Sequence, residues 1–259
     1  MAYLKAHSRD LFCETDTGEA HLDNFSQLLI LQNTGDRSLV TLDHKGPTWG
    51  YFIGSPVFAE TVYPNDSDTT ALAMAVLEDI SAEDKEAAMD VILSYLSPDG
   101  LPYCWFDKDR PRFCHCICAN VFRFFYLNNR SKDLPSVYGY LCSLLQSRGD
   151  PGLQDMRDLL ILRVRERIGR DKIILGASMR LLSAQMLGIT NQEDLETILD
   201  AQQLDGGWEL SWLWHYGKEP GMIGSRGVVT AMAVNGIQRA WKSSKLRALD
   251  SMHCNGTRG

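Results

Sequence analysis

The chain lacks the features of a membrane-embedded or exported protein. No apolar run among its 259 residues reaches the roughly 18 residues that a membrane span needs. Residues 1–14 lack the apolar core of a signal peptide. The 7 cysteines are an odd number, which is typical of a reducing compartment and not of a disulfide scaffold. We therefore expect a soluble, cytoplasmic protein without a membrane span.

Positive charge is also scarce. Lys and Arg total 26 against 33 Asp and Glu, which gives a net charge of -7. Bulk electrostatics therefore argue against nucleic acid as a partner, and an anionic ligand would need a local group of cationic side chains. A chain that is 44% hydrophobic and 23% charged has ordinary globular composition and enough apolar residues for a sizeable core.

Helical periodicity dominates from residue 66 onward. Three segments are rich in Ala, Met and β-branched residues and carry almost no charge, namely residues 68–77, 175–184 and 226–235. A helix that is apolar on all sides is a buried helix. Amphipathic segments such as residues 82–96 lie between them. This alternation predicts an all-α fold in which buried and half-exposed helices form the two layers of an α/α barrel.

Asp-Gly turns recur along this region. Residues 98–100 precede Trp105, and residues 204–207 precede Trp208, so that each turn is followed by aromatic side chains. Repeated helix pairs with such turns indicate internal duplication. We expect the barrel to span residues 61–245. A partly helical N-terminal extension, residues 1–60, would precede it, and a disordered tail, residues 246–259, would follow.

The most informative stretch is residues 63–71, Tyr-Pro-Asn-Asp-Ser-Asp-Thr-Thr-Ala. Asp66 or Ser67 can cap the helix that follows, and Asp68 then lies in its first turn. The spacing of the two carboxylates also fits a plain helix cap with surface acids, because Asp is common at such positions.

The stretch resembles the Asp-x-Asp-Asp-Thr-Ala motif of class II terpene cyclases, and more closely the Asp-x-Asp-Thr-Thr variant of drimane-type sesquiterpene cyclases. The resemblance implies that Asp68 is the general acid, that Asp66 orients it, and that Thr69 replaces a third acid. An alkene is a very weak base, so the donor must be a carboxyl group that stays protonated near neutral pH. Burial raises a carboxyl pKa and provides such a donor.

Other stretches are similar to the same family. Residues 203–209 resemble the Gln-Trp motif of squalene-cyclase-like and prenyltransferase-like barrels, and residues 106–112, 165–169 and 223–227 resemble parts of drimane cyclases. The similarity runs from about residue 63 to residue 241 and implies the toroid-like barrel fold. No Asp-Asp-x-x-Asp stretch occurs, which supports protonation as the first step and a product that keeps its diphosphate.

The resemblance also implies a substrate site for an isoprenoid diphosphate, with Mg²⁺ helping to hold the diphosphate. Aromatic faces stabilise carbocations, and guanidinium groups bind phosphate in a bidentate way. Each such side chain has a plainer alternative, which is core packing for the aromatics and a solvated surface for the cations. The candidates are Trp105, Trp208, Trp212 and Tyr216 for the wall, Arg110, Arg112 and Arg226 for the phosphates, and His215 and Lys218 as weaker cationic groups.

Residues 114–118, Cys-His-Cys-Ile-Cys, invite a zinc interpretation. The spacing is poor for a structural zinc site, and no second ligand pair is evident. Buried thiols on a helix are the favoured interpretation, and we predict no metal-ligating residues.

Two departures from the family pattern qualify these expectations. Only about 60 residues precede the motif, too few for the haloacid-dehalogenase-like phosphatase domain of many relatives. The product would then stay phosphorylated unless a separate phosphatase acts on it. The segment around residues 137–150 is short, so we expect the barrel to be incomplete there.

Three functions follow. The leading one is class II cyclisation of farnesyl diphosphate to a bicyclic drimane-type diphosphate, initiated by Asp68. The second is a non-catalytic or degenerate isoprenoid-binding helical barrel. The third is a protein-prenyltransferase-like subunit, which would need a zinc site of Asp, Cys and His that the sequence does not assemble.

Overall fold

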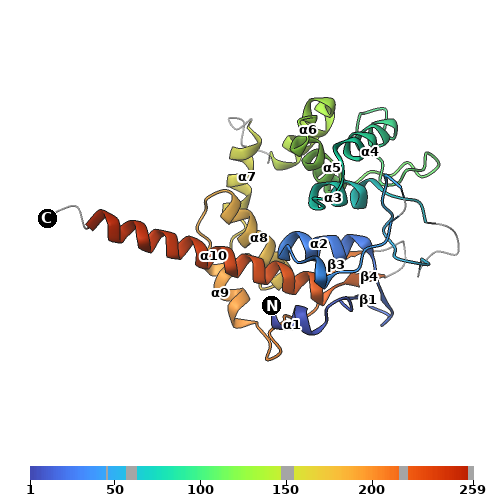
Figure 1. Ribbon diagram of the computed structural model, residues 1–259. Helices are drawn as coiled ribbons and strands as arrows, with labels where there is room; N and C mark the ends of the chain where they lie inside the picture. Colours follow the sequence, from blue (N-terminus) through green and yellow to red (C-terminus); the bar gives the residue numbers. More distant parts are fainter. Residues whose placement is uncertain (45, 57–62, 147–154, 216–220, 256–259) are drawn as a thin grey trace.

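A computed structural model describes residues 1–44, 46–56, 63–146, 155–215 and 221–255, with side chains up to residue 242 (Figure 1). The chain is mainly helical with a small sheet. The α-helices are α1 (Ala2–Ala6), α2 (Asn24–Thr34), α3 (Ser67–Val76), α4 (Ala82–Ser94), α5 (His115–Leu127), α6 (Pro135–Leu145), α7 (Met156–Arg165), α8 (Ile174–Met186), α9 (Gln192–Asp200) and α10 (Arg226–Asn255). The shorter elements are η1 (Arg37–Leu39), η2 (Ser131–Asp133), β1 (Cys13–Thr15), β2 (Ala20–His21), β3 (Trp212–His215) and β4 (Met222–Gly224).

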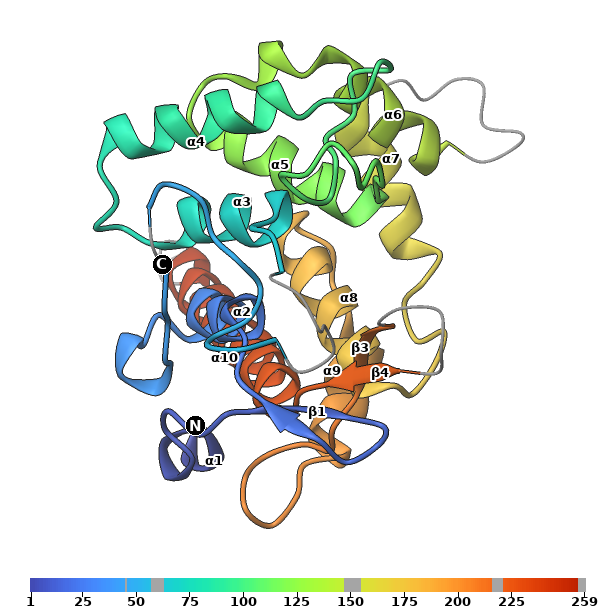
Figure 2. The ribbon, with the colours of Figure 1, turned by 90° about the vertical axis from the view of Figure 1, so that its right-hand side faces the viewer.

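The long helices form a closed ring. Contacts run from α2 to α3, α5, α6, α7, α8 and α10 in turn, and α10 contacts α2 again. Figure 2 shows α3 and α5 above α2 and α10, with α7 and α8 at the side. α4 packs on α3, and α9 packs on α8 and α10, so these two helices lie outside the ring. The predicted helical fold is confirmed.

Two expectations about the ring can be compared with this arrangement. α6 and α7 contact each other, whereas residues 147–154 between them lie outside the described part, so the expected gap near residues 137–150 stays a prediction. The helix α2 belongs to the ring, which makes the predicted N-terminal extension part of the main body. α10 continues to Asn255, into the stretch predicted to be a disordered tail.

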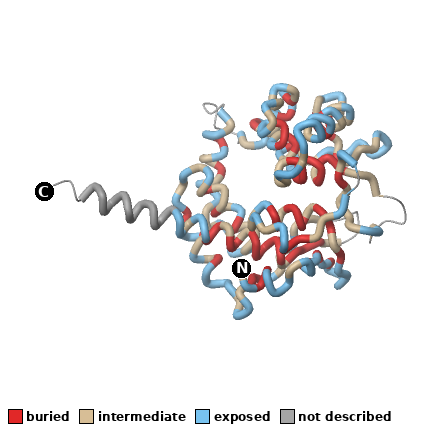
Figure 3. Tube along the Cα trace, in the orientation of Figure 1, coloured by how far each residue is buried: buried red, intermediate tan, exposed pale blue. Residues whose placement is uncertain are grey.

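α3 and the first turns of α10, which flank α2 in the ring, are buried, as the sequence predicted. Seven of the ten residues of α3 are buried, and the first turns of α10 bury Val228, Val229, Ala231 and Ala233. Small Ala side chains let such helices approach closely and still fill the interior. Figure 3 shows buried residues along the ring helices, whereas α4 and α9 have exposed outer faces. Among the described helices, none is both long and apolar enough to cross a membrane.

The sequence analysis did not foresee the sheet. Its strand order is β2-β1-β4-β3, and all neighbours are antiparallel. Glu14 pairs with Gly224, which joins the start of the chain to the segment before α10. A Cβ atom on Gly224 would meet the backbone oxygen of Ser211 at 2.8 Å, so only glycine fits this strand. Strands of two to four residues leave no readable period in a sequence.

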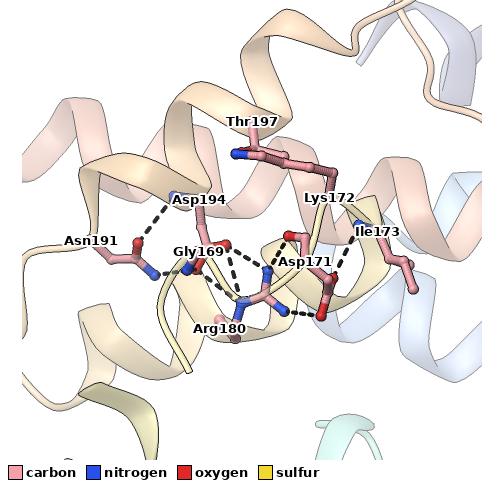
Figure 4. Close-up of polar contacts among 8 residues, drawn as sticks. All are labelled: Gly169, Asp171, Lys172, Ile173, Arg180, Asn191, Asp194 and Thr197. Carbon is pink, nitrogen blue, oxygen red and sulfur yellow. Dashed lines mark hydrogen bonds and ion pairs between the residues drawn. The ribbon is translucent and has the colours of Figure 1, made fainter. Parts of the chain in front are cut away.

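A buried polar network fixes α9 on α8 (Figure 4). Arg180 donates from Nε to both oxygens of Asp194 at 3.1 Å and from a second nitrogen to Oδ1 at 2.7 Å. Asp194 is fully buried and also accepts the side-chain N–H of Asn191 at 2.8 Å. Arg180 pairs with Asp171 at 3.1 Å as well. Gly169, in the stretch that resembled the drimane group, takes φ +67° and donates its backbone N–H to Asp194 Oδ2 at 3.4 Å.

Candidate active site

The Asp-x-Asp-Thr-Thr stretch begins α3, and Asp66 is its N-cap. Asp66 Oδ1 accepts the backbone N–H of Thr69 at 2.6 Å, as capping requires. The backbone of Asp66 is held from two sides, because its N–H donates to the Trp49 carbonyl at 3.0 Å and the residue forms a β-bridge with Trp105. Of the two predicted caps, Asp66 and Ser67, the structure shows Asp66 in this role.

Two distant segments clamp this helix start. The Ser67 N–H donates to the Cys104 carbonyl at 2.9 Å, and its hydroxyl donates to the Tyr103 carbonyl at 2.7 Å. On the other side, the Trp49 N–H donates to the Thr70 hydroxyl at 2.8 Å. The backbone of this first turn is therefore held from two sides, which places the two carboxylates in a rigid setting.

Asp68 lies in the first turn of α3 and points toward α5. It is half-buried, and its Oδ1 accepts the side-chain N–H of Asn120 at 2.7 Å. Among the described residues, no Lys or Arg forms an ion pair with it. Burial raises the pKa of Asp68 to about 6, and the Asn120 hydrogen bond opposes this shift. A minority of the molecules therefore carries this proton at neutral pH, and the protonated fraction rises as pH falls toward 6.

Asp66 and Thr69 lie deeper than Asp68. Asp66 is 7% exposed, and its Oδ2 is buried without a hydrogen-bond partner. Burial raises the pKa of Asp66 to about 7; the Thr69 N–H works against the shift, and the charge of Asp68 adds to it. Thr69 is fully buried next to this carboxyl group. Two neighbouring carboxyls with raised pKa values can hold and deliver a proton, which is what a general acid requires.

A row of aromatic rings extends from this helix start across the ring interior to the sheet. Successive ring centroids lie 4.8 to 6.2 Å apart, and the planes are nearly perpendicular, as edge-to-face packing favours. The row brings together aromatics that follow the two Asp-Gly turns with others that the sequence analysis had not selected. Its members in order are Trp105, Tyr63, Phe52, Tyr51, Trp214 and Phe25.

The other predicted aromatics are not in this row. Trp208 is fully buried and donates its indole N–H to the Ile198 carbonyl at 2.6 Å, which is a packing role. Trp212 is 44% exposed on β3. Tyr216 lies outside the described residues. Of the four predicted wall aromatics, the structure thus brings only Trp105 next to the Asp66–Asp68 pair.

The predicted phosphate-binding cations are dispersed. Arg226 begins α10 and donates to the Trp208 carbonyl at 2.8 Å, to Asp205 at 2.9 Å and to Gln203, while its guanidinium lies 4.2 Å from the Tyr3 ring. These internal bonds hold Arg226 beside the 203–208 turn, and they were not predicted.

The remaining cations lie on the surface or outside the described part. Arg110 and Arg112 are exposed, and Arg110 pairs with Asp107 at 3.2 Å. His215 is exposed at the end of β3. Lys218 lies outside the described residues. A phosphate-binding role stays a prediction for all of them.

Asn120 and the pair Tyr51 and Phe52 are the main residues that sequence reasoning missed. Asn120 follows the Cys-Ile-Cys stretch on an apolar face of α5, and its polarity on that face was the one available signal. Two hollows of about 600 and 590 Å³ lie elsewhere, one below the C-terminal end of α3 and one between α5, α6 and α7. Neither is lined by a predicted site residue, so the site rests on the side chains around α3.

A ring of helices with an Asp-x-Asp-Thr-Thr helix start defines a terpenoid-cyclase-like protein. The model of the sesquiterpene cyclase astC-like C-terminal domain matches residues 1–128, a region that includes the clamped helix start and Asn120. The N-terminal half of the chain is therefore similar to this family of sesquiterpene cyclases.

Among characterised proteins, the chain is similar to drimenol cyclase drtB of Aspergillus calidoustus, with 34% identity over 264 residues. The alignment covers 92% of this chain and 50% of that protein. The chain thus spans about half the length of this curated relative.

Proposed function

We propose that the protein cyclises farnesyl diphosphate by protonation and that Asp68 is the general acid. The observation that carries this proposal is a carboxyl pair at one helix start without a cationic partner among the described residues, in a region that matches a sesquiterpene cyclase domain. An ion pair with Lys or Arg would hold the carboxylates ionised, whereas burial favours the protonated form that alkene protonation needs.

The first step is transfer of the Asp68 proton to the distal carbon–carbon double bond of the substrate. The π electrons form the new C–H bond, and the adjacent carbon becomes a cation. Asn120 holds Oδ1, so Oδ2 is the oxygen that carries the transferable proton. Asp66 is a positioning residue in this scheme, because it caps the helix that carries Asp68 and its raised pKa keeps it partly neutral beside the newly ionised Asp68.

The later steps are ring closures and the loss of a proton. Two internal double bonds attack successive cationic carbons, and a base or water removes a proton to give a bicyclic drimane-type diphosphate. The aromatic row supports this part of the proposal, because ring faces stabilise carbocations. The proton taken up by solvent balances the proton that Asp68 delivered, and the diphosphate stays attached.

Among the described residues, neither candidate group of metal ligands suits Mg²⁺. Two groups of side chains could hold a metal ion there, and both contain Cys and His. Mg²⁺ prefers oxygen ligands in octahedral geometry, so neither group suits it. We therefore derive no step through Mg²⁺, and a role in binding the diphosphate stays a prediction.

The test is incubation of wild type with farnesyl diphosphate, phosphatase treatment and product analysis by gas chromatography and mass spectrometry. Removing a general acid costs about 10²–10⁴-fold in rate, so Asp68→Asn should lose product to that extent. Asp99→Asn changes an exposed turn carboxylate and should keep wild-type activity. Equal product from wild type and Asp68→Asn would refute the role of Asp68. Binding of farnesyl diphosphate by wild type without turnover would instead support the isoprenoid-binding barrel.

A further inference from the structure

A second buried polar cluster lies apart from Asp68, where the sheet meets the start of α2. Cys13 on β1, His21 on β2 and Asp23, the N-cap of α2, are all buried, with 1%, 5% and 0% exposure. One potential ligand atom from each lies within 4.8 Å of the others. The sequence analysis did not assemble this set of Cys, His and Asp, although it named such a set as a requirement for zinc.

Strand register explains why the three meet. Cys13 pairs directly with His21 across the two strands, so their side chains share one face. Asp23 follows His21 by two residues in extended chain, which returns its side chain to the same face. The cluster is therefore a product of the β1–β2 hairpin and the cap of α2, and none of its members is adjacent in sequence.

The carboxylate of Asp23 is incompletely satisfied. Its Oδ1 accepts the Ser26 N–H at 2.7 Å, whereas Oδ2 has no nitrogen or oxygen donor at hydrogen-bond distance and lies 3.8 Å from His21 Nε2. The Cys13 thiol also contacts this carboxylate. No Lys or Arg pairs with Asp23 in the part of the chain that the structure describes. A fully buried carboxylate normally has a cation or several N–H donors, so the unpartnered oxygen points to a positively charged ligand.

We propose that Cys13, His21 and Asp23 bind a zinc ion. A thiolate, an imidazole and a carboxylate are a ligand set that suits Zn²⁺ and not Mg²⁺ or Ca²⁺. The negative charges of the thiolate and the carboxylate balance the charge of the ion, so the filled site is neutral in the protein interior. This proposal is independent of the cyclase function.

The three ligand atoms need to move only a short distance to bind zinc. Zinc bonds of about 2.0–2.3 Å at tetrahedral angles hold ligand atoms about 3.5 Å apart. The observed separations of up to 4.8 Å would close by at most about 1.3 Å. Ser26 Oγ lies 2.8 Å from Cys13 Sγ and can donate to the thiolate. Such partners around a site orient its ligands. Water would complete the fourth position, and the ion would tie the hairpin to the start of α2.

The test uses the full chain, freed of metal by a chelator and then titrated with Zn²⁺ or Co²⁺. Wild type should bind stoichiometrically, show thiolate-to-cobalt charge-transfer absorption, and melt at a higher temperature with zinc. Cys13→Ala should lose the absorption. Asp23→Asn should lose about 100-fold or more in zinc affinity. Because Asn can also cap α2, this variant tests the site even if Cys13→Ala fails to fold.

Two controls separate this site from other thiols. Cys142→Ala removes a buried thiol elsewhere, and Cys116→Ser disrupts the other ligand group, Cys114, His115 and Cys116; both should leave cobalt absorption unchanged. Absence of stoichiometric binding by wild type, equal binding by Cys13→Ala, or loss of binding in Cys116→Ser would overturn the proposal. Each readout is independent of cyclase activity, so failure here is distinguishable from failure of the proposed function.

Discussion

Buried carboxylates occur in two regions of this molecule with opposite surroundings. Asp194, between α8 and α9, receives three hydrogen bonds from Arg180 and one from Asn191. Asp66, at the start of α3, receives one backbone N–H and has a second carboxylate, Asp68, as its charged neighbour. Both are nearly inaccessible to water, and the contrast between them lies in the partners that the fold provides.

The difference shows that one fold can use the same functional group in two ways. Asp194 forms a structural ion pair with Arg180, whereas Asp66 and Asp68 form a carboxyl pair that can bind a proton. Hydrogen bonds to Asp194 raise the pKa of Arg180, so that pair stays charged. Burial without a cation raises the pKa of Asp66 to about 7 and that of Asp68 to about 6. Stability is favoured in the first region, and a reactive protonation state in the second.

The largest effect on stability is expected from breaking the ion pair between Arg180 and Asp194. Arg180→Met keeps much of the side-chain volume but leaves Asp194 buried without its cation, which costs about 3–5 kcal/mol in the free energy of unfolding. Urea denaturation monitored by circular dichroism measures this loss. Arg110→Met removes an exposed pair with Asp107 and should cost less than about 1 kcal/mol. Similar losses in both variants would show that the buried pair has no special role.

A smaller change of opposite sign in the free energy of unfolding is expected when Asp66 is replaced. The folded-state pKa of Asp66 lies above its ordinary value, so the folded protein binds more protons than the unfolded chain between about pH 4 and pH 7. Stability from this group is therefore present at low pH and lost as pH rises through about 7. Asp66→Asn keeps a capping side chain and should be more stable than wild type at pH 8, by roughly 1–3 kcal/mol.

The measurement is urea denaturation of both proteins at pH 5 and pH 8. The stability difference between the two pH values should shrink in Asp66→Asn, and Asp99→Asn should keep the wild-type difference, since Asp99 is exposed. A pH dependence that Asp66→Asn leaves unaltered would mean that this carboxylate is not a buried, proton-binding group.

The smallest effect is expected on the pH profile of turnover. The Asn120 hydrogen bond favours ionised Asp68, so Asn120→Ala should raise the pKa of Asp68. Because the proposed reaction needs the protonated acid, kcat/KM falls as pH rises through about 6 in wild type. In Asn120→Ala this decline should move to higher pH by up to about one unit, the size of one hydrogen bond to a charged group. A decline at the wild-type pH would exclude Asn120 as the group that tunes Asp68.

Local signals predicted the parts of the fold that local sequence determines. The cap at Asp66 and the buried helix after it follow from a cap residue and an Ala-rich run, and both are confirmed. The partner Asn120 lies 52 residues away and meets Asp68 only through the packing of α5 on α3, so no spacing rule could find it. The meeting of Cys13, His21 and Asp23 likewise depends on the register of two very short strands.

Arg226 illustrates the opposite error of reading too much into a motif. A lone Arg between glycines fits anion binding, yet its guanidinium is bonded to Gln203, Asp205 and the Trp208 carbonyl. Sequence patterns indicate that an arginine is required at such a place, but they do not reveal whether its partner is a ligand or the protein's own turn.

The closure of the ring between α2 and α10 also bears on how the chain folds as it leaves the ribosome. Asn33 on α2 bonds to Asn235 on α10, a partner 202 residues later in the chain. At about 5–20 residues per second, synthesis delivers that partner some 10–40 seconds after α2 has emerged. During this interval α5 already covers α3, but the side of α2 that packs on α10 has no permanent cover, so newly made chains should depend on chaperones until α10 arrives.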